Sequence, residues 1–209
     1  YVVVNSSGQA IGTVKTFCNQ EVFSASVIKL NNNNVLIAYD NNEGKTIVLN
    51  PLTGEVFSAS VFANTKAARI RTAKLSNGNI IIAYIDKNNN NKSAYVICDS
   101  NGNVVNSPVI LSTTATYNLQ NYMNIDVAVL QNGNAMIIYT EEGNDNYGVY
   151  AAIISSTGQL IEKKLVENIR GGHLTIVAMS EGGAVLSYDT DAKSKFVYYK
   201  HSTNTFAGP

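Results

Sequence analysis

The stretch that decides the fold runs from Ala73 to Asn103 and reads AKLSNGNIIIAYIDKNNNNKSAYVICDSNGN. It contains short apolar runs separated by turns rich in Asn and Gly, residue types that adopt turn conformations readily. The run that ends at Tyr84 is apolar at consecutive positions, which predicts a strand covered on both faces. The stretch therefore predicts three antiparallel strands joined by two turns.

The same pattern occurs four times along the chain. We name the strands of one repeat A, B, C and D. Strand A ends in Leu or Met, and a four-residue turn leads to strand B. The third position of that turn is Asn or Gly, which adopt positive φ at low cost. Strand B closes on a tyrosine, at Tyr39, Tyr84, Tyr139 and Tyr188. A repeat of roughly 50 residues with four short strands is typical of a β-propeller blade.

These repeats predict an all-β fold, a single β-propeller domain over residues 1–209 with about four blades of four antiparallel strands each. Residues 24–62, 69–112 and 123–167 form whole blades in this prediction. A split blade takes strands C and D from residues 1–17 and strands A, B and C from residues 173–201. Five C strands then serve four A–B pairs. The surplus strand is left outside the ring, pairs with another molecule, or marks a piece of a longer propeller.

Composition excludes several classes of function. Lys and Arg (15) balance Asp and Glu (15), and only 14% of residues are charged, so the basic surface of a nucleic-acid-binding protein is missing. The longest apolar runs are too short for a transmembrane segment. Because the chain opens at Tyr1 without Met, we expect a mature or trimmed product. We also expect the protein to lie outside the cell or at its surface. Sequons at Asn5 and Asn91 fall in predicted turns.

The pattern Leu-x-x-Gly-x-apolar-run-aromatic, followed by x-apolar-x-x-x-Thr/Asn-Gly, resembles the degenerate blades of repeat β-propellers in surface and secreted proteins. The turns NPLTGEVF (50–57) and SSTGQLIE (155–162) are similar to quinoprotein-type propeller repeats, although the closing Trp of that type is absent. The turn SNGN (76–79) stands where sialidase-like propellers carry their Asp-box, without the full motif. The resemblance covers nearly the whole chain and implies architecture only, because propellers host enzymes, lectins and scaffolds alike.

Polar residues recur at the start of the A strands, which line the central channel of a propeller. Alternate residues of a strand point to one face, so two aligned rows face this channel. The collar that they predict consists of Arg69, Arg71, Asn124, Asp126 and His173. It suits a small polar or anionic ligand. The alternative is a structural ion pair between Arg71 and Asp126, since buried charges need partners.

The B–C loops carry carboxylates, the ligands that Ca²⁺ prefers. Asp189 and Asp191 come nearest to a calcium motif, but solvated turn residues explain the pattern better, and we expect neither a metal nor a cofactor. Glu141 and Glu142 are adjacent and would point to opposite faces of a strand, so they do not form the paired carboxylates of a glycosidase. His173 has no matching Ser or Cys nucleophile.

Three functions remain as hypotheses. The leading one is a non-enzymatic extracellular structural or interaction protein, whose unpaired strand edges bind another protein or assemble the chain into filaments by strand donation. The first alternative is a lectin-like propeller, in which Tyr117, Tyr122 and Tyr147 near the loops stack on glycans. The second alternative is a glycoside-processing enzyme.

Overall fold

The computed structural model describes residues 1–115, 124–142, 147–190 and 193–208 of the chain. In these residues it contains strands, turns and irregular segments without a helix, so no helix in the described part is long and apolar enough to cross a membrane. Four sheets have four antiparallel strands each, and a fifth has two. The predicted all-β propeller architecture is confirmed.

Each four-stranded sheet is a blade whose strands follow one another in chain order. The first blade contains β3 (Ser24–Lys29), β4 (Val35–Asp40), β5 (Gly44–Leu49) and β6 (Val56–Ala63). The second contains β7 (Ala67–Lys74), β8 (Ile80–Asp86), β9 (Lys92–Cys98) and β10 (Val109–Ile110). The third contains β11 (Ile125–Val129), β12 (Ala135–Glu142), β13 (Tyr147–Ile154) and β14 (Leu160–Glu167). The fourth contains β15 (Gly172–Ala178), β16 (Ala184–Asp189), β17 (Ser194–Lys200) and β18 (Thr205–Ala207).

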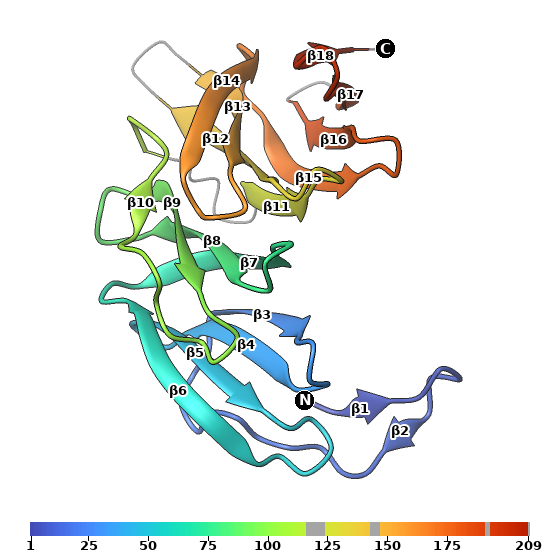
Figure 1. Ribbon diagram of the computed structural model, residues 1–209. Coiled ribbons are helices and arrows are strands. Elements are labelled where there is room, and N and C mark those ends of the chain that lie inside the picture. The colour runs from blue at the N-terminus through green and yellow to red at the C-terminus, as the bar shows by residue number, and fades with distance from the viewer. Residues whose placement is uncertain (116–123, 143–146, 191–192, 209) are drawn as a thin grey trace.

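The blades follow one another along an arc, with the first strands β3, β7, β11 and β15 on its concave side (Figure 1). The first blade and the fourth blade lie at the two ends of this arc. In each blade one face, which we call the front, turns toward the preceding blade. The other face, which we call the back, turns toward the following blade.

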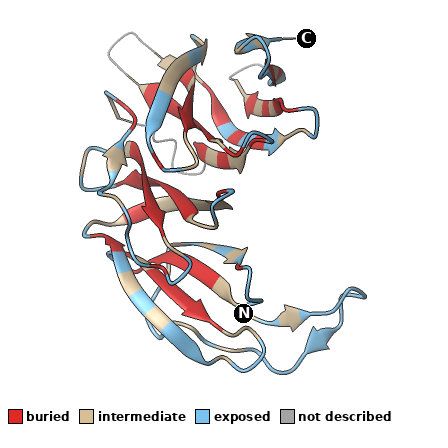
Figure 2. Ribbon diagram, viewed as in Figure 1, coloured by how far each residue is buried: buried red, intermediate tan, exposed pale blue. Residues whose placement is uncertain are grey.

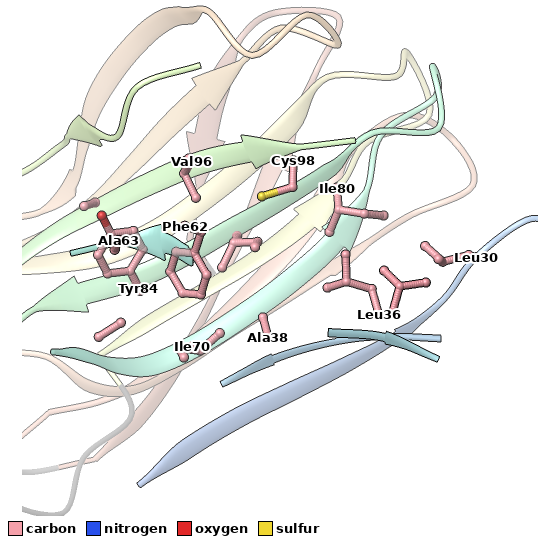
Figure 3. Packing of buried hydrophobic residues seen from close by; sticks show 14 residues of the cluster. Leu30, Leu36, Ala38, Phe62, Ala63, Ile70, Ile80, Tyr84, Val96 and Cys98 are labelled. Atoms are coloured by element: carbon pink, nitrogen blue, oxygen red, sulfur yellow. The ribbon is translucent and has the colours of Figure 1, made fainter. Parts of the chain in front are cut away.

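The second strands form the centre of the hydrophobic core, as their apolar sequences predict (Figure 2). The four closing tyrosines have exposed fractions of 7% or less. Between the first two blades, Leu36 and Ala38 of β4 pack toward Ile80 and Tyr84 of β8 (Figure 3). The Phe62 ring meets the Tyr84 ring edge-on, with the centroids 5.4 Å apart. Each fully buried aliphatic side chain of this kind contributes about 1.5–3 kcal/mol, so the interfaces between blades carry much of the stability.

The predicted turn conformations are also confirmed. The third residue of each A–B turn has positive φ: Asn33 (64°), Gly78 (88°), Gly133 (84°) and Gly182 (93°). The C–D turns use Gly54, Gly102 and Gly158 in the same region, at 79°, 80° and 87°.

The structure corrects the predicted split blade, because the fourth blade supplies its own last strand. Asn204 adopts a φ of 53° and reverses the chain, and β18 then pairs with β17. The Phe206 ring lies on the Tyr199 ring with the centroids 5.2 Å apart, which anchors this short strand. Residues 1–17 therefore do not complete the sheet formed by residues 172–207.

Residues 1–17 form a separate hairpin, with β1 (Val3–Val4) paired to β2 (Ala10–Ile11). Its turn closes with two backbone hydrogen bonds: Gly8 N donates to Asn5 O at 3.0 Å, and Asn5 N donates to Gln9 O at 2.9 Å. In the second blade, the Asp99–Asn103 turn makes the same two bonds at 3.0 and 2.8 Å. The A–B turn at Leu75 makes the same two bonds at 3.0 and 2.8 Å, so the turn alone does not distinguish a C–D pair from an A–B pair. The C–D identity of residues 1–17 stays a prediction, and no A–B pair lies in their sheet among the described residues.

Candidate functional site

The collar occupies the first strands of the blades, on the concave side of the arc (Figure 1). Lateral hydrogen bonds join these strands from blade to blade. Ser24 Oγ accepts from Ile70 N at 2.9 Å, and Ser26 Oγ lies 2.8 Å from Thr72 Oγ1. The aligned rows predicted from the repeats are therefore neighbours in space.

Arg69 and His173 occupy equivalent positions and share an unusual backbone. Each lies in a register shift between the first and second strands of its blade, and their φ values are 55° and 48°. The bulges direct the next residues, Ile70 and Leu174, into the blade interfaces, where their exposed fractions are 0% and 1%. A left-handed conformation at a non-glycine residue costs about 1–3 kcal/mol and is characteristic of functional sites. The two bulges therefore lie in β7 and β15, the first strands of their blades, which line the concave side of the arc.

Arg71 and Asp126 connect the second and third blades through an ion pair. Arg71 Nε lies 3.7 Å from Asp126 Oδ1, and the two side chains are 25% and 18% exposed. Asp126 Oδ2 also accepts from Ile176 N at 3.0 Å and from Thr175 Oγ1 at 3.4 Å on the fourth blade. The ion pair thus links two blades, as the structural alternative to ligand binding requires.

The other collar residues differ in exposure. Asn124 is buried, with an exposed fraction of 2%. His173 Nδ1 lies 3.1 Å from Asp189 Oδ2, and the side chains are 43% and 48% exposed. Asp189 Oδ1 accepts from Ser194 Oγ at 2.6 Å. His173 is therefore the most exposed of the collar residues, and Arg69 is half-buried.

The carboxylates at the ends of the second strands fasten loops. Asp86 accepts from Thr65 Oγ1 at 2.7 Å and from two backbone N–H groups of its own loop at 3.1 and 3.2 Å. Burial raises the pKa of Asp40, and the N–H groups of Ala67 and Asn42 partly offset this effect. These contacts favour the structural reading of the acidic loops.

The predicted calcium candidates do not assemble a site within the described part of the chain. Asp189 contacts His173 through one carboxylate oxygen and accepts a hydrogen bond from Ser194 with the other. Asp191 lies outside the described residues. Among the residues that the structure describes, no group of three or more His, Cys, Asp and Glu side chains could hold a metal ion. Both cysteines, Cys18 and Cys98, are free thiols.

Glu141 is buried, at 5% exposure, and its neighbour Glu142 is half-buried on the opposite face of β12. Thr113 Oγ1 donates to Glu141 Oε2 at 2.7 Å, and Lys163 Nζ pairs with its Oε1. Lys163 Nζ also lies 4.9 Å from the centroid of the Tyr150 ring. The cluster ties the D strand of the third blade to its core.

The remaining predicted positions are peripheral. Tyr147 accepts from Arg170 at 2.6 Å, and the guanidinium lies 4.2 Å from its ring centroid, so this ring is already stacked. Tyr117 and Tyr122 lie outside the described residues. Asn5 is exposed in the hairpin turn, and Asn91 is half-buried with a φ of 56°.

Sequence reasoning missed the contacts that link one blade to the turn of the next. Thr46 Oγ1 donates to Gly102 O at 2.8 Å, and Tyr95 Oη donates to Gly158 O at 3.0 Å. Both acceptors are glycines of C–D turns. In the strand register, Thr46 pairs with Ala38 and Tyr95 pairs with Ala83, which are equivalent positions of two second strands. Thr46 and Tyr95 are therefore equivalent to each other, but this is recognised only once the register is known.

A second missed cluster joins the third and fourth blades. Glu167 accepts hydrogen bonds from Lys195 Nζ and Tyr188 Oη. These bonds lower the pKa of Glu167, whereas burial and the nearby carboxylate raise the pKa of Tyr188 well above its usual range. The closing tyrosine of the fourth blade is thus held by an ion pair as well as by the core.

No family model and no curated protein matches the chain. Solved structures do resemble it. A protein of unknown function from Bacteroides caccae is 14% identical, with a TM-score of 0.59 over 99% of this chain and 66% of that one. The Dos1 propeller is 13% identical, with a TM-score of 0.56 over 99% of this chain and 49% of that one.

An ulvan lyase, a polysaccharide lyase solved with a bound GlcA(1-4)Rha3S carbohydrate, is 13% identical, with a TM-score of 0.56 over 94% of this chain and 59% of that one. The chain thus spans between about half and two thirds of the length of these three solved proteins. At such identities the likeness establishes the propeller fold and leaves the activity open.

Proposed function

We propose that the chain is part of a carbohydrate-binding propeller that holds an anionic sugar on its concave side without catalysing a reaction. The observation that carries the proposal is the pair of left-handed bulges that present Arg69 and His173 at equivalent positions. Arginine binds carboxylate and sulfate groups with two N–H donors at once, which suits uronic acids and sulfated sugars.

The fold comparison supports this ligand class, because a polysaccharide lyase with a bound uronate-containing carbohydrate is among the similar structures. Propellers bind many other ligands, so the collar residues carry the argument. Extracellular polysaccharides are the natural source of such sugars, which agrees with the expected location outside the cell.

The contacts of the nearby acids support binding without catalysis. Asp126 is paired with Arg71 and accepts from a backbone N–H, and Asp189 is paired with His173 and Ser194. Hydrolysis of a glycoside requires one carboxyl group that donates a proton and a second that acts as base or nucleophile. Asp126 and Asp189 are both held by neighbouring groups, which supports a role in positioning rather than in catalysis.

Isothermal titration calorimetry with a glucuronate-containing tetrasaccharide tests this proposal. Arg69→Gly removes the guanidinium while glycine tolerates the positive φ, so the variant stays folded. Loss of one charge-assisted contact, about 1.5–3 kcal/mol, weakens binding by roughly 10- to 100-fold. Lys74→Ala is the matched control, because this cation of β7 lies at the opposite end of the strand and bonds Asn31.

Three results bear on the proposal. Binding that weakens in Arg69→Gly, persists in Lys74→Ala and disappears with the carboxyl-reduced tetrasaccharide supports it. Equal binding by both variants, or no binding by the unmodified protein at millimolar sugar, contradicts it. Release of shortened sugars during the titration would overturn the non-enzymatic part.

A second candidate function, a protein-interaction scaffold, is favoured by the back face of the fourth blade. Val177 and Phe196 are 57% and 54% exposed there. The strand register places Val185 opposite Tyr198 on the same face, and their counterparts in the second blade, Ile81 and Ile97, are 0% exposed. An uncovered face of this kind is a protein-contact surface. Sedimentation analysis of the unmodified chain and of Phe196→Ser tests it, since association that persists in the variant argues against this surface.

A further inference from the structure

The N-terminal hairpin sits on the first blade as the outer half of a blade would. Tyr1 is the counterpart of Tyr95 by position, because each residue lies four positions before the first residue of a turn that closes with the same two hydrogen bonds. Tyr1 packs against the buried front face of the first blade, with Ile37 and Tyr39. Tyr95 packs in the same way against Ile137 and Tyr139 of the third blade.

The hydroxyl groups of the two tyrosines reach equivalent places as well. Tyr95 Oη donates to the carbonyl of Gly158, the glycine of the next C–D turn. Tyr1 Oη lies 3.6 Å from the position that a Cβ would take at Gly54, the glycine of the corresponding turn in the first blade. The two hydroxyl groups therefore lie beside equivalent turn glycines, although Tyr1 Oη makes no hydrogen bond among the described residues.

The front face of the first blade is exposed to solvent at β3, beside the part that the hairpin covers. Val27 is 65% exposed, although the residues at the same register position in the third and fourth blades, Val127 and Ile176, are 8% and 6% exposed. In the third blade, that position is covered by the second blade, whose β8 residues Ile81 and Ala83 are fully buried. The first blade has a front face of the same type without such a cover.

A cavity of about 650 Å³ occupies this place. It lies between the hairpin residues Tyr1–Val4 and the strands β3 and β4, and its lining includes Val27, Val35 and Ile37. Its walls are predominantly apolar, which suits aliphatic side chains rather than a sugar.

The backbone of β1 also has one edge available. Tyr1 N and Asn5 N bond to the β2 side of the hairpin, at 2.8 Å to Lys15 O and 2.9 Å to Gln9 O. Because alternate residues of an antiparallel strand point to opposite edges, the N–H and C=O groups of Val2 and Val4 point to the cavity side. In the complete blades this edge of the third strand pairs with the second strand.

We propose that this surface binds a two-stranded antiparallel β-hairpin of the A–B type, whose second strand pairs with β1 and whose aliphatic face fills the cavity. The proposal extends the established interface between blades onto the first blade. The chemistry of the occupant is that of the existing A–B pairs, with residues such as Leu36 and Ala38 or Ile81 and Ala83 facing the next blade.

The occupant comes from polypeptide other than residues 1–209. Each A–B pair of this chain (β3–β4, β7–β8, β11–β12 and β15–β16) already hydrogen-bonds to its own third strand. A second copy would have to open one of its own sheets to donate such a pair. This surface is separate from the collar, so the proposal stands independently of carbohydrate binding.

The test extends the full chain at its N-terminus with a second copy of residues 67–94, the A–B pair of the second blade and its following loop. Tyr1 then takes the place that Tyr95 has after Ala94. Hydrogen exchange, followed by NMR, reports on the amides of Val2 and Val4. We expect their exchange to slow by about 100-fold or more, as for paired strand amides. The matched control carries Ile81→Asp and Ala83→Asp in the added copy, which places carboxylates against the apolar cavity and restores fast exchange.

A second measurement keeps the test decisive. Residues 67–94 are added in trans as a synthetic peptide to the unmodified chain, with the same two amides observed. Slowed exchange in either format, absent with the Asp-containing sequence, supports the proposal. Fast exchange in both formats overturns it. Slow exchange in the unmodified chain alone, rising with protein concentration together with dimer formation in sedimentation, also overturns it, because the occupant is then a second copy.

Discussion

Removal of the Tyr95 hydroxyl isolates the bond that fastens one blade to the turn of the next. Tyr95 is fully buried, and Tyr95 Oη donates to Gly158 O at 3.0 Å across the interface between the second and third blades. Burial raises the pKa of this hydroxyl, so it remains a donor into the alkaline range. Tyr95→Phe keeps the ring and deletes the bond, leaving a carbonyl without its buried partner. Such a loss costs about 1–2 kcal/mol, between the net value of a hydrogen bond and the penalty of an unsatisfied buried group.

Urea denaturation and thermal melting measure this cost. For a chain of this size, 1–2 kcal/mol lowers Tm by roughly 3–6 °C. Tyr198→Phe is the control, because Tyr198 lies on the uncovered back face of the fourth blade and is half-buried. Its change should stay within about 0.5 kcal/mol. If Tyr95→Phe costs no more than Tyr198→Phe, the hydroxyl does not fasten the turn and the reasoning is refuted. Thr46→Val, which deletes the matching bond to Gly102 in another interface, should add to Tyr95→Phe independently.

Three further predictions follow from the turns, the thiols and the tyrosines. Gly158→Ala should lower the free energy of unfolding in urea by about 2–4 kcal/mol, because its Cβ would meet Ile97 Cγ1 at 2.5 Å and its φ is 87°. Gly8→Ala, with a φ of 78° and nothing within 4 Å, should cost only the backbone strain of about 1–2 kcal/mol. Equal costs for the two variants would contradict this packing. Iodoacetamide at pH 8 should modify Cys18 and spare Cys98 in the folded protein, because burial raises the pKa of the Cys98 thiol to about 12. Mass spectrometry of the labelled peptides measures this, and faster labelling of Cys98 than of Cys18 would contradict it. Burial also raises the pKa of Tyr84, Tyr139 and Tyr188 well above the ordinary value, so the folded state favours their neutral forms. The free energy of unfolding should therefore stay constant with respect to these groups below about pH 10 and fall as the pH rises further. A constant urea midpoint up to pH 12 would contradict the buried state of these tyrosines.

Much of the architecture could be predicted because each blade repeats one local pattern. The closing tyrosines and the turn glycines recur at fixed positions, and local chemistry determines their strands and turns. The last strand of the fourth blade could not be predicted in the same way. Thr205–Ala207 is three residues long, and its pairing depends on the reversal at Asn204 and on the contact between Phe206 and Tyr199.

The candidate site was predicted in part. Aligned repeats brought Arg71 and Asp126 into the same neighbourhood, because neighbouring blades place equivalent strands side by side. The left-handed bulge at Arg69 carries no signal in the sequence, because Arg is not among the residue types enriched at positive φ, whereas His, the type at position 173, is one of them. The bulges arise from the demand to bury the residue that follows, which appears only when the blades are stacked.

NMR titration of the isotope-labelled chain with the glucuronate-containing tetrasaccharide tests the central claim most directly. It reports which amides meet the sugar without relying on any substitution. The account predicts that chemical shifts change at residues 69–72 of β7 and 172–175 of β15, on the concave side of the arc. Shift changes confined to the loops or to the N-terminal hairpin, or none at millimolar sugar, would contradict it.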